Sequence, residues 1–169
     1  MTTSQPNIRS GIGYDIHRLV AGRPLIIGGV EFDSEVGLDG HSDADVLLHA
    51  IADAILGAAA MGDIGQHFPP GAPEWAGADS VALLTACVGK LRSAGWEVGN
   101  VDATVIAEAP KINPRAAELR QRIAGALGIE VDAVSLKATT NELLGSIGRG
   151  EGIAALAIAT ILRRSGDAG

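Results

Sequence analysis

The sequence has few aromatic residues and no excess of positive charge. Aromatic residues make up 3% of its 169 residues, and the formal net charge at pH 7 is −7. Proteins that bind single-stranded nucleic acid stack bases on aromatic side chains, and proteins that bind phosphate backbones gather Lys and Arg on one surface. The composition therefore argues against a nucleic-acid-binding protein. Binding of phosphate in a small pocket stays open, because that needs positive charge only locally.

Cysteine and long apolar runs are also scarce. Cys87 is the single cysteine, so no disulfide forms within the chain. Its place in a helical pattern favours a buried, inert thiol. No uninterrupted apolar run approaches the length of a transmembrane helix, and the first ten residues lack the apolar region of a signal peptide. We therefore expect a cytoplasmic protein with no membrane partner.

Composition and pattern indicate one globular domain. Hydrophobic residues make up 47% of the chain and charged residues 20%, which are typical globular values, and the length suffices for a sizeable core. We expect residues 1–7 to be disordered and residues 165–169 to be frayed. Strands and helices interleave, which predicts an α/β or α+β fold around one sheet. The predicted strands are 8–19, 24–32, 98–108, 131–139 and 153–164, the predicted helices begin at Ser42 and cover 78–94 and 114–127, and the predicted loops are 33–41, 62–77 and 140–152.

Two metal-binding residue types stand close together in the first predicted strand. Asp15 and His17 are separated by one residue, and alternate residues of a strand point to the same face. A catalytic zinc site uses three protein ligands and keeps a fourth position open. The pair therefore needs one more ligand to form such a site.

His49 is the candidate for the third ligand. The helix that contains it has Ser42 as its expected N-cap, with Asp45 three positions later as in a capping box. Asp45, His49 and Asp53 recur every four residues on the polar side of this helix, so the two carboxylates can orient the imidazole. A helix packed on the first strand would bring His49 to Asp15 and His17. A solvated Asp–His pair and an exposed helix histidine remain the alternative.

Further segments carry groups that suit a phosphorylated ligand. Residues 137–142 end a predicted strand and enter a glycine-rich loop, 145–152, where hydroxyl groups, backbone N–H groups and Arg149 can bind phosphate oxygens. Glu142 is a candidate Mg²⁺ ligand, because this cation prefers carboxylate and phosphate oxygens. Asp63 can accept hydrogen bonds from sugar hydroxyls, and residues 107–113 can shape a pocket. A hairpin with turn glycines and a turn-forming Asp63 are the alternatives.

Taken together, these segments resemble the 2-C-methyl-D-erythritol 2,4-cyclodiphosphate synthase family of the non-mevalonate isoprenoid pathway. The matching segments run in family order over nearly the whole chain: GIGYDIH at 11–17, HSDADVLLH at 41–49, GDIG at 62–65, AEAPK at 107–111, KATTNE at 137–142 and GRGEG at 148–152. A set of motifs in this order is far more specific than any one of them.

The resemblance implies a fold, an assembly and a reaction. The subunit would be a ferredoxin-like α/β (α+β) domain, with a four-stranded mixed sheet and helices on one face. Three subunits would form a homotrimer with the sheets around the three-fold axis and the active sites between adjacent subunits. The substrate would be 4-diphosphocytidyl-2-C-methyl-D-erythritol 2-phosphate, whose 2-phosphate attacks the β-phosphate, so that CMP leaves and a cyclic diphosphate forms.

The resemblance also implies residue roles. One Zn²⁺ per active site would be held by Asp15, His17 and His49, and Mg²⁺ or Mn²⁺ by Glu142, while His41 and Thr140 would stabilise the transition state. The implied substrate contacts are Asp15, His17, Ser42, Asp63, Ile64, Gly65, Ala107, Ala109, Pro110, Lys111, Ile112, Asn113, Thr139, Thr140, Glu142 and Arg149.

Two other functions remain as alternatives. The same three metal ligands would serve another metal-dependent phosphoesterase, which would hydrolyse its substrate. A non-catalytic trimer could instead bind an isoprenoid diphosphate in an apolar cavity on its axis. Ser146 stands where the family often has an aromatic residue lining that cavity, whereas Arg149 and Glu151 match residues at its mouth.

Overall fold

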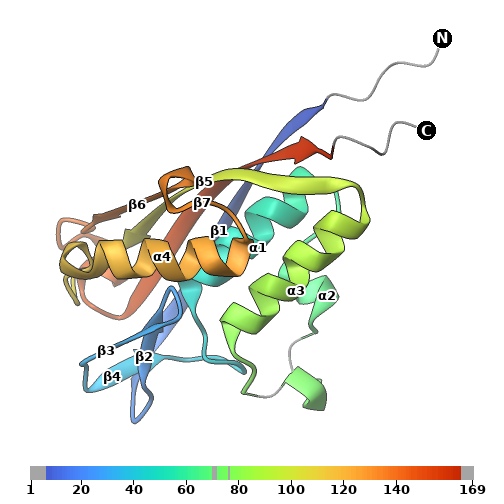
Figure 1. The fold of residues 1–169 in the computed structure, drawn as a ribbon. Coiled ribbons are helices and arrows are strands. Elements are labelled where there is room, and N and C mark those ends of the chain that lie inside the picture. Colours follow the sequence, from blue (N-terminus) through green and yellow to red (C-terminus); the bar gives the residue numbers. More distant parts are fainter. Residues whose placement is uncertain (1–6, 70–71, 76, 165–169) are drawn as a thin grey trace.

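The computed structural model describes residues 7–69, 72–75 and 77–164 of the chain. Of the chain ends predicted to be disordered (1–7) or frayed (165–169), residues 1–6 and 165–169 lie outside the described residues, while the Asn7 carbonyl oxygen accepts a hydrogen bond from the Arg163 N–H at 2.9 Å. Figure 1 shows a sheet with its long helices on one side and a small hairpin at one end. The start of β1 lies beside the end of β7, where Ile8 pairs with Leu162.

The main sheet has five strands in the described part of the chain, in the order β4-β1-β7-β5-β6. Neighbouring strands are antiparallel except for β5 and β6, which are parallel, so the sheet is mixed. The expected count of four strands is wrong, because segment 33–41 was predicted as a loop and contains β4, whose three residues are too few to leave a periodic pattern. The strands are β1 (Ile8–Ala21), β4 (Val36–Leu38), β5 (Trp96–Ile106), β6 (Val134–Thr139) and β7 (Gly152–Arg163).

The connectivity also differs from a ferredoxin-like domain. That fold has the element order βαββαβ, whereas the long elements of this chain, leaving aside the short strands β2 to β4 and the short helical turns, come in the order β1, α1, α3, β5, α4, β6 and β7. Helix α4 (Ala116–Leu127) joins the parallel strands β5 and β6, and β7 then pairs between β1 and β5. The expectation of a mixed α/β sheet is confirmed, and the ferredoxin-like topology is not.

A two-stranded hairpin replaces the predicted strand 24–32. Strands β2 (Leu25–Ile27) and β3 (Val30–Phe32) pair antiparallel and are joined by Gly28 and Gly29. Both glycines have positive φ, 62° and 72°, which a two-residue hairpin turn with twisted strands requires. The glycines that predicted a bend therefore form a complete reversal of the chain.

Three long helices cover one face of the main sheet, as predicted (Figure 1). Helix α1 (Val46–Ala58) packs on β1 and β7, α3 (Ser80–Ser93) packs beside α1, and α4 packs on β6. The N-cap of α1 is Asp45 and not Ser42, because the Asp45 carboxylate accepts hydrogen bonds from the N–H groups of Leu47 and Leu48. The same buried carboxylate accepts from the N–H groups of Gly28 and Gly29, so it ties the hairpin to the helix.

Short helical turns occupy segments where none was predicted. The segments α2 (Ile64–His67), η1 (Pro73–Trp75) and α5 (Gly145–Gly148) lie within predicted loops, while η3 (Val131–Ala133) begins the predicted strand 131–139 and η2 (Asn113–Arg115) precedes α4. Helix α4 therefore starts at Ala116, later than predicted, and it ends as predicted at Gly128, which adopts the left-handed conformation. Cys87 is buried in α3, and burial raises the pKa of its thiol to about 12, as expected of an inert thiol.

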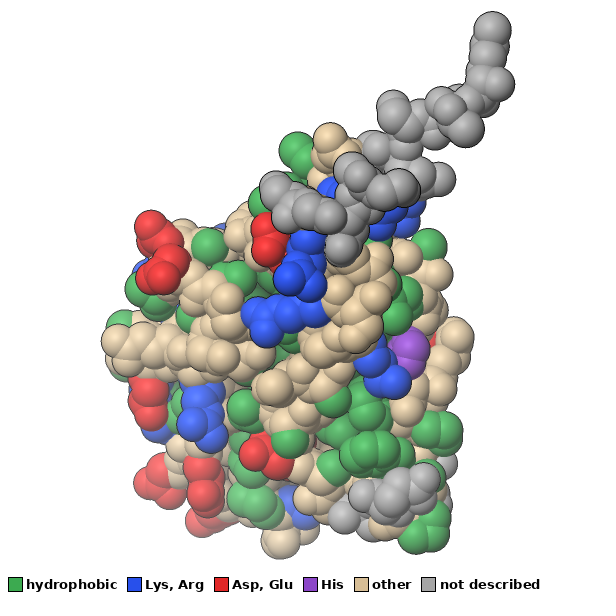
Figure 2. Space-filling model, turned by 45° about the vertical axis from the view of Figure 1, so that its right-hand side comes forward, with side chains coloured by type: hydrophobic (Ala, Val, Ile, Leu, Met, Phe, Trp, Pro, Cys, Tyr) green, Lys and Arg blue, Asp and Glu red, His purple; other side chains and the backbone are tan. Residues whose placement is uncertain are grey.

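The second face of the sheet is apolar, and among the described residues nothing covers it. Along β1 the side chains of Ile8, Ile12, Tyr14 and Ile16 are exposed, and on the paired strand β7 so are those of Leu156 and Ile158. We call this group of six side chains the open sheet face. Figure 2 shows a different face, where Lys and Arg side chains lie among acidic and apolar ones and form no single large patch. Among the described residues, no helix has the length and apolar character needed to cross a membrane.

Candidate active site

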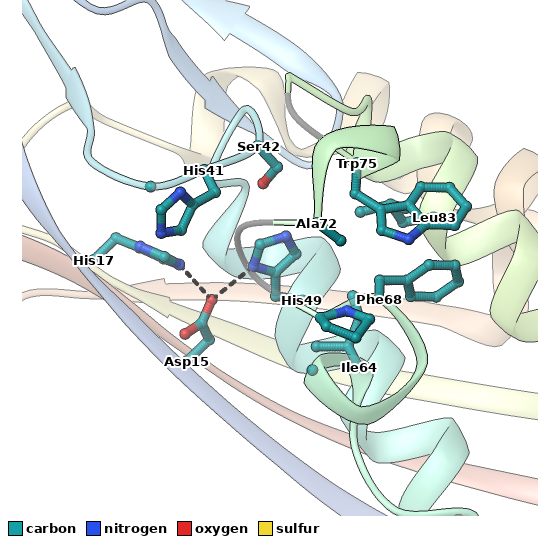
Figure 3. A pocket seen from close by; sticks show the side chains of 13 residues that line it. Asp15, His17, His41, Ser42, His49, Ile64, Phe68, Ala72, Trp75 and Leu83 are labelled. Atoms are coloured by element: carbon teal, nitrogen blue, oxygen red, sulfur yellow. Dashed lines mark hydrogen bonds and ion pairs between the residues drawn. The ribbon is translucent and has the colours of Figure 1, made fainter.

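Asp15, His17 and His49 come together between β1 and α1 (Figure 3). The Asp15 Oδ2 atom lies 3.0 Å from His17 Nε2 and 3.1 Å from His49 Nδ1. Asp15 and His17 point to the helix-covered face, because the alternate residues of β1 belong to the open sheet face. Gly11 and Gly13 let α1 approach that face so closely that His49 reaches the pair. The strand alternation and the helix position thus produce the cluster.

Each imidazole of the cluster is oriented by its remaining ring nitrogen. His17 Nδ1 lies 2.6 Å from the carbonyl oxygen of Asp39, which can only accept, so this nitrogen carries the proton. His49 Nε2 lies 3.1 Å from the Ser80 hydroxyl. With the outer nitrogens engaged, His17 Nε2 and His49 Nδ1 both face the Asp15 carboxylate.

The three groups are electrostatically coupled. Burial favours the neutral form of Asp15, but hydrogen bonds and charge from His17 and His49 outweigh it and hold the pKa of the carboxyl well below its usual range. The hydrogen bond with Asp15 in turn raises the pKa of His17, against the opposing effect of burial. The cluster therefore holds an ionised carboxylate against one ring nitrogen of each of two imidazoles.

The donor set fits a metal ion. One carboxylate oxygen and two imidazole nitrogens all lie within 4.8 Å of one another. Zinc sites accept this combination, and the ligand histidines in such sites give their other ring N–H to a protein acceptor, as His17 does here. These three residues could hold a metal ion, with a fourth position facing the cavity.

The cluster lines one end of a cavity of about 440 Å³. His41 and Ser42 lie on the same side as His17, and Arg23 fixes their loop by donating to the carbonyl oxygens of Gly40 and Ser42. Ile64 and Gly65 also line the cavity, whose other wall is apolar and formed by Phe68, Trp75 and Leu83 (Figure 3). The cavity thus joins an end lined by a carboxylate and imidazoles to an apolar wall.

Both carboxylates predicted to orient His49 act elsewhere. Asp45 is buried at the N-terminus of α1 and bonds the hairpin, as described above. Asp53 accepts a hydrogen bond of 2.7 Å from the Ile64 N–H, and burial raises its pKa. Asp53 therefore fixes the start of α2, where Asp63 caps the helix by accepting from the Gln66 N–H. That role of Asp63 matches the alternative of a turn-forming aspartate, although it stays next to the cavity.

The other predicted contacts gather in a second cavity of about 300 Å³. It is lined by residues from the ends of β5 and β6 and from the segment before α4, namely Ala107, Pro110, Lys111, Ile112, Asn113, Pro114, Ala138, Thr139 and Thr140. Ala109 precedes the cis peptide bond to Pro110. Among the described residues, the two cavities have no lining residue in common. The described part of the chain therefore carries two separate groups of candidate residues.

Glu142 and Arg149 lie outside both cavities. Glu142 is exposed and accepts a hydrogen bond from the Thr140 hydroxyl at 3.2 Å, so it stays near the second cavity and does not join the metal cluster. Arg149 is exposed and pairs with Glu151 at 2.6 Å. Neither contact brings a phosphate-binding group to Asp15.

Two residues of the site gave no signal in the sequence. Ser80 is buried behind His49 and also bonds Asp43. Glu108 accepts hydrogen bonds from the N–H groups of Asn141 and Leu143, which holds the loop that carries Thr140 and Glu142. The AEAPK motif contains Glu108, and Ser80 follows Asp79, the N-cap of α3, but nothing local indicates what either side chain meets.

Comparison with known proteins gives consistent matches. The YgbB family model matches residues 8–162. The chain is 56% identical over 155 residues to the 2-C-methyl-D-erythritol 2,4-cyclodiphosphate synthase of Synechococcus elongatus, covering 92% of this chain and 97% of the relative. It is 59% identical over 154 residues to the synthase of the same name from Symbiobacterium thermophilum, covering 91% and 98%.

Solved structures share the fold. The Plasmodium falciparum IspF in its CDP complex has a TM-score of 0.84 and 33% identity, covering 96% of this chain and 100% of that one. The bifunctional IspDF from Campylobacter jejuni has a TM-score of 0.89 and 40% identity, covering 92% of this chain and 42% of that one. The resemblance inferred from the ordered motifs is confirmed, and the chain belongs to the YgbB family.

Proposed function

We propose that this chain converts 4-diphosphocytidyl-2-C-methyl-D-erythritol 2-phosphate to 2-C-methyl-D-erythritol 2,4-cyclodiphosphate with release of CMP. The observation that carries the proposal is the identity of 56% and 59% to synthases of this name over nearly the full length of both chains. The geometry supports it, because a metal-ligand cluster opens into a cavity large enough for part of such a substrate. The enzyme is a cyclising phosphorus–oxygen lyase.

The reaction needs two phosphates to meet despite their charge. Zn²⁺ bound by Asp15, His17 and His49 would act as a Lewis acid on a phosphate oxygen, and Mg²⁺ or Mn²⁺ at Glu142 would neutralise charge between the phosphates. An oxygen of the 2-phosphate forms the new bond to the β-phosphorus, and the bond from that phosphorus to the CMP oxygen breaks. The electron pair and the charge leave with CMP, so no water is consumed and no protein nucleophile is required.

The chain's own residues position the reactants and stabilise charge. His41 and Ser42 line the cavity beside the metal ligands, where they can donate hydrogen bonds to phosphate oxygens. We assign His41 and the Thr140 hydroxyl to charge that develops at the β-phosphate, and Thr139 to phosphate binding. The walls formed by Phe68 and Trp75 exclude water from the reacting groups, which strengthens these interactions.

The second cavity would hold the cytidine portion. Segment 107–113 offers backbone groups and Lys111 around a small pocket, and the Plasmodium falciparum relative is described as a CDP complex. Asp63, Ile64 and Gly65 would contact the erythritol portion from the first cavity. One substrate molecule would therefore reach from one group of residues to the other.

A homotrimer would complete the site. The two cavities of one subunit have no lining residue in common among the described residues, so we infer that the metal cluster of one subunit meets the cytidine pocket of its neighbour. The open sheet face is apolar and would pack around the three-fold axis. An axial cavity bordered by Arg149 and Glu151 would be the place for an isoprenoid diphosphate. We propose that this trimer works in the cytoplasm.

The decisive experiment is incubation of the protein with the diphosphocytidyl substrate and divalent metal, followed by mass analysis of the products. The cyclase produces CMP and a cyclic product that retains both phosphates. A linear product with one added water would establish a phosphoesterase instead, and retention of the substrate without turnover would establish a binding protein.

A matched pair of variants tests the site itself. His49→Ala removes a proposed metal ligand and abolishes CMP release. His67→Ala removes a histidine whose one hydrogen-bond partner among the described residues is the Met61 carbonyl oxygen, and it leaves CMP release largely intact. Full activity and full zinc content in His49→Ala would contradict the assignment.

A further inference from the structure

A pair of hydrogen-bonded side chains, Asp43 and Ser80, lies behind His49 and has no part in the reaction as proposed. Ser80 is 1% exposed at the start of α3, and its hydroxyl lies 3.1 Å from His49 Nε2. The same hydroxyl bonds Asp43 Oδ1, and the Ser80 N–H donates to Asp43 Oδ2 at 2.9 Å. A buried serine is thus held between a carboxylate and a metal-ligand histidine.

The available protons determine the direction of these bonds. An ionised carboxylate only accepts, and a serine hydroxyl has a single proton to donate. Because Asp43 takes both the N–H and the O–H of Ser80, the Ser80 oxygen has only lone pairs left for His49. His49 must then carry its proton on Nε2, which leaves the Nδ1 lone pair directed at Asp15 and the cavity.

We propose that Asp43 and Ser80 are positioning residues that fix the tautomer and ring orientation of His49, so that Nδ1 serves as the metal ligand. This inference rests on the proposed metal-dependent function and deepens it. His17 has the equivalent support from a backbone carbonyl, that of Asp39, which no side-chain substitution removes. His49 depends on side chains, so its support can be tested by mutation.

The position of the pair strengthens this reading. Asp43 lies in the loop between His41 and α1, while Ser80 belongs to α3, so the two bonds connect the elements on either side of the cavity. The Asp43 N–H also lies 3.4 Å from the Ala78 carbonyl oxygen just before α3. The orientation of His49 is therefore fixed by the same contacts that hold the cavity walls together.

Two variants remove the support in different ways. Ser80→Ala deletes the acceptor of the His49 Nε2 proton. Asp43→Asn keeps the volume but replaces one oxygen by an NH₂ group. Because the bond from the Ser80 N–H to Oδ2 (2.9 Å) is shorter than the bond from the Asp45 N–H to Oδ1 (3.2 Å), we expect the amide oxygen to stay on the Ser80 N–H and the NH₂ to turn toward the Ser80 oxygen. The Ser80 proton is then free to point at His49 Nε2, which favours the tautomer with the proton on Nδ1. Both variants should weaken zinc affinity about 10- to 100-fold, the usual effect of losing a partner of a ligand histidine.

The measurement is zinc affinity by competition with a chelator, together with ¹⁵N NMR of the His49 ring in the zinc-loaded protein. Wild type should show a proton on Nε2, and the variants should lose that signature or exchange it rapidly. Ser80→Thr keeps the hydroxyl and should retain the affinity. Ser93→Ala is the matched control, because Ser93 is on the same helix and its hydroxyl donates, within the described part of the chain, to the Gly89 carbonyl oxygen alone. The zinc affinity of this variant should not change.

The outcomes separate the two proposals. Wild-type affinity and an unchanged Nε2 proton in both Ser80→Ala and Asp43→Asn would overturn the positioning role. Should Ser80→Ala fail to fold, Asp43→Asn decides the matter, since it is nearly isosteric. If the wild type binds zinc with the expected tautomer and the variants lose it, the positioning role holds even when no CMP is released, and only the proposed reaction fails.

Discussion

Replacing Gly13 by alanine would force α1 away from β1 and disrupt the metal cluster while leaving every ligand in place. A Cβ atom built on Gly13 lies 1.9 Å from the Ala50 carbonyl oxygen and 2.8 Å from the Ala54 nitrogen. Both are backbone atoms of α1, so no side-chain rotation relieves the contact. Non-bonded atoms cannot lie this close to one another, so strand and helix must move apart by about 1 Å or more.

The magnitude follows from where the ligands stand on these elements. Asp15 lies two residues after Gly13 on β1, and His49 precedes Ala50 on α1. Metal–ligand distances tolerate only about 0.2 Å, so a separation of about 1 Å removes His49 Nδ1 from the metal. We expect CMP release to fall by about 100-fold or more, and overpacking to lower the free energy of unfolding by about 1–3 kcal/mol.

The assay combines chelator competition for zinc with denaturant unfolding of the metal-free protein. The control is Gly125→Ala, inside α4, where an added Cβ meets nothing within 4 Å. It should raise the free energy of unfolding by about 0.5–1 kcal/mol, because alanine is the better helix former, and leave zinc affinity unchanged. Gly13→Ala with wild-type zinc affinity and an unchanged unfolding midpoint would refute the reasoning.

Three further perturbations test other parts of the structure. Asp45→Ala removes the acceptor of four backbone N–H groups, those of Gly28, Gly29, Leu47 and Leu48. Denaturant unfolding should show that the free energy of unfolding falls by about 3–5 kcal/mol; a decrease below about 1 kcal/mol would contradict the role of the cap. Because Asp15 raises the pKa of His17, the pair stabilises the metal-free protein fully below about pH 6.5, and this contribution is lost as the pH rises through the raised pKa. In His17→Gln, the free energy of unfolding should no longer show this dependence on pH. An unchanged dependence would count against the pair. Ile12→Asp places a charge on the open sheet face, where Ile12 is 64% exposed. Light scattering should show a monomer, and this monomer should not release CMP. The control Ala86→Asp, on the exposed side of α3, should remain a trimer.

Much of the metal cluster could be predicted because strand alternation is a local rule. The spacing of Asp15 and His17 determines that both side chains share a face, whatever the rest of the chain does. The ordered motifs added the family, and with it the reaction. The helix that carries His49 was also predicted, since its apolar side chains recur with helical period.

The start of that helix could not be predicted, because three residues with capping side chains precede it. Ser42, Asp43 and Asp45 all suit an N-cap by type. Asp45 takes the role because Gly28 and Gly29, far away in the sequence, present two further N–H groups to the same carboxylate. Ser42 instead accepts a bond from the Ala44 N–H, and Asp43 meets Ser80. Tertiary contacts therefore determine which of the three residues caps the helix, since their local sequence does not distinguish them.

The same limit explains the carboxylates around His49. Their four-residue spacing does place Asp45, His49 and Asp53 along one side of α1, but that side meets three different environments. The hairpin lies at its N-cap, the cavity at its first turn, and the start of α2 near its middle. Helical periodicity predicts on which side of the helix a side chain lies, but it does not predict which segment of the chain that side contacts.

Strand β1 links the metal cluster to the proposed assembly. Its odd-numbered residues Asp15 and His17 point toward α1, and its even-numbered residues Ile12 and Tyr14 belong to the open sheet face. In the proposed trimer, a partner subunit that packs on the open sheet face would contact the strand that carries two of the three proposed metal ligands. Since metal sites tolerate only small displacements, loss of the trimer should weaken zinc binding as well as separate the two cavities. Zinc affinity of the monomeric Ile12→Asp protein equal to that of wild type would show that the strand holds its ligands without the neighbour.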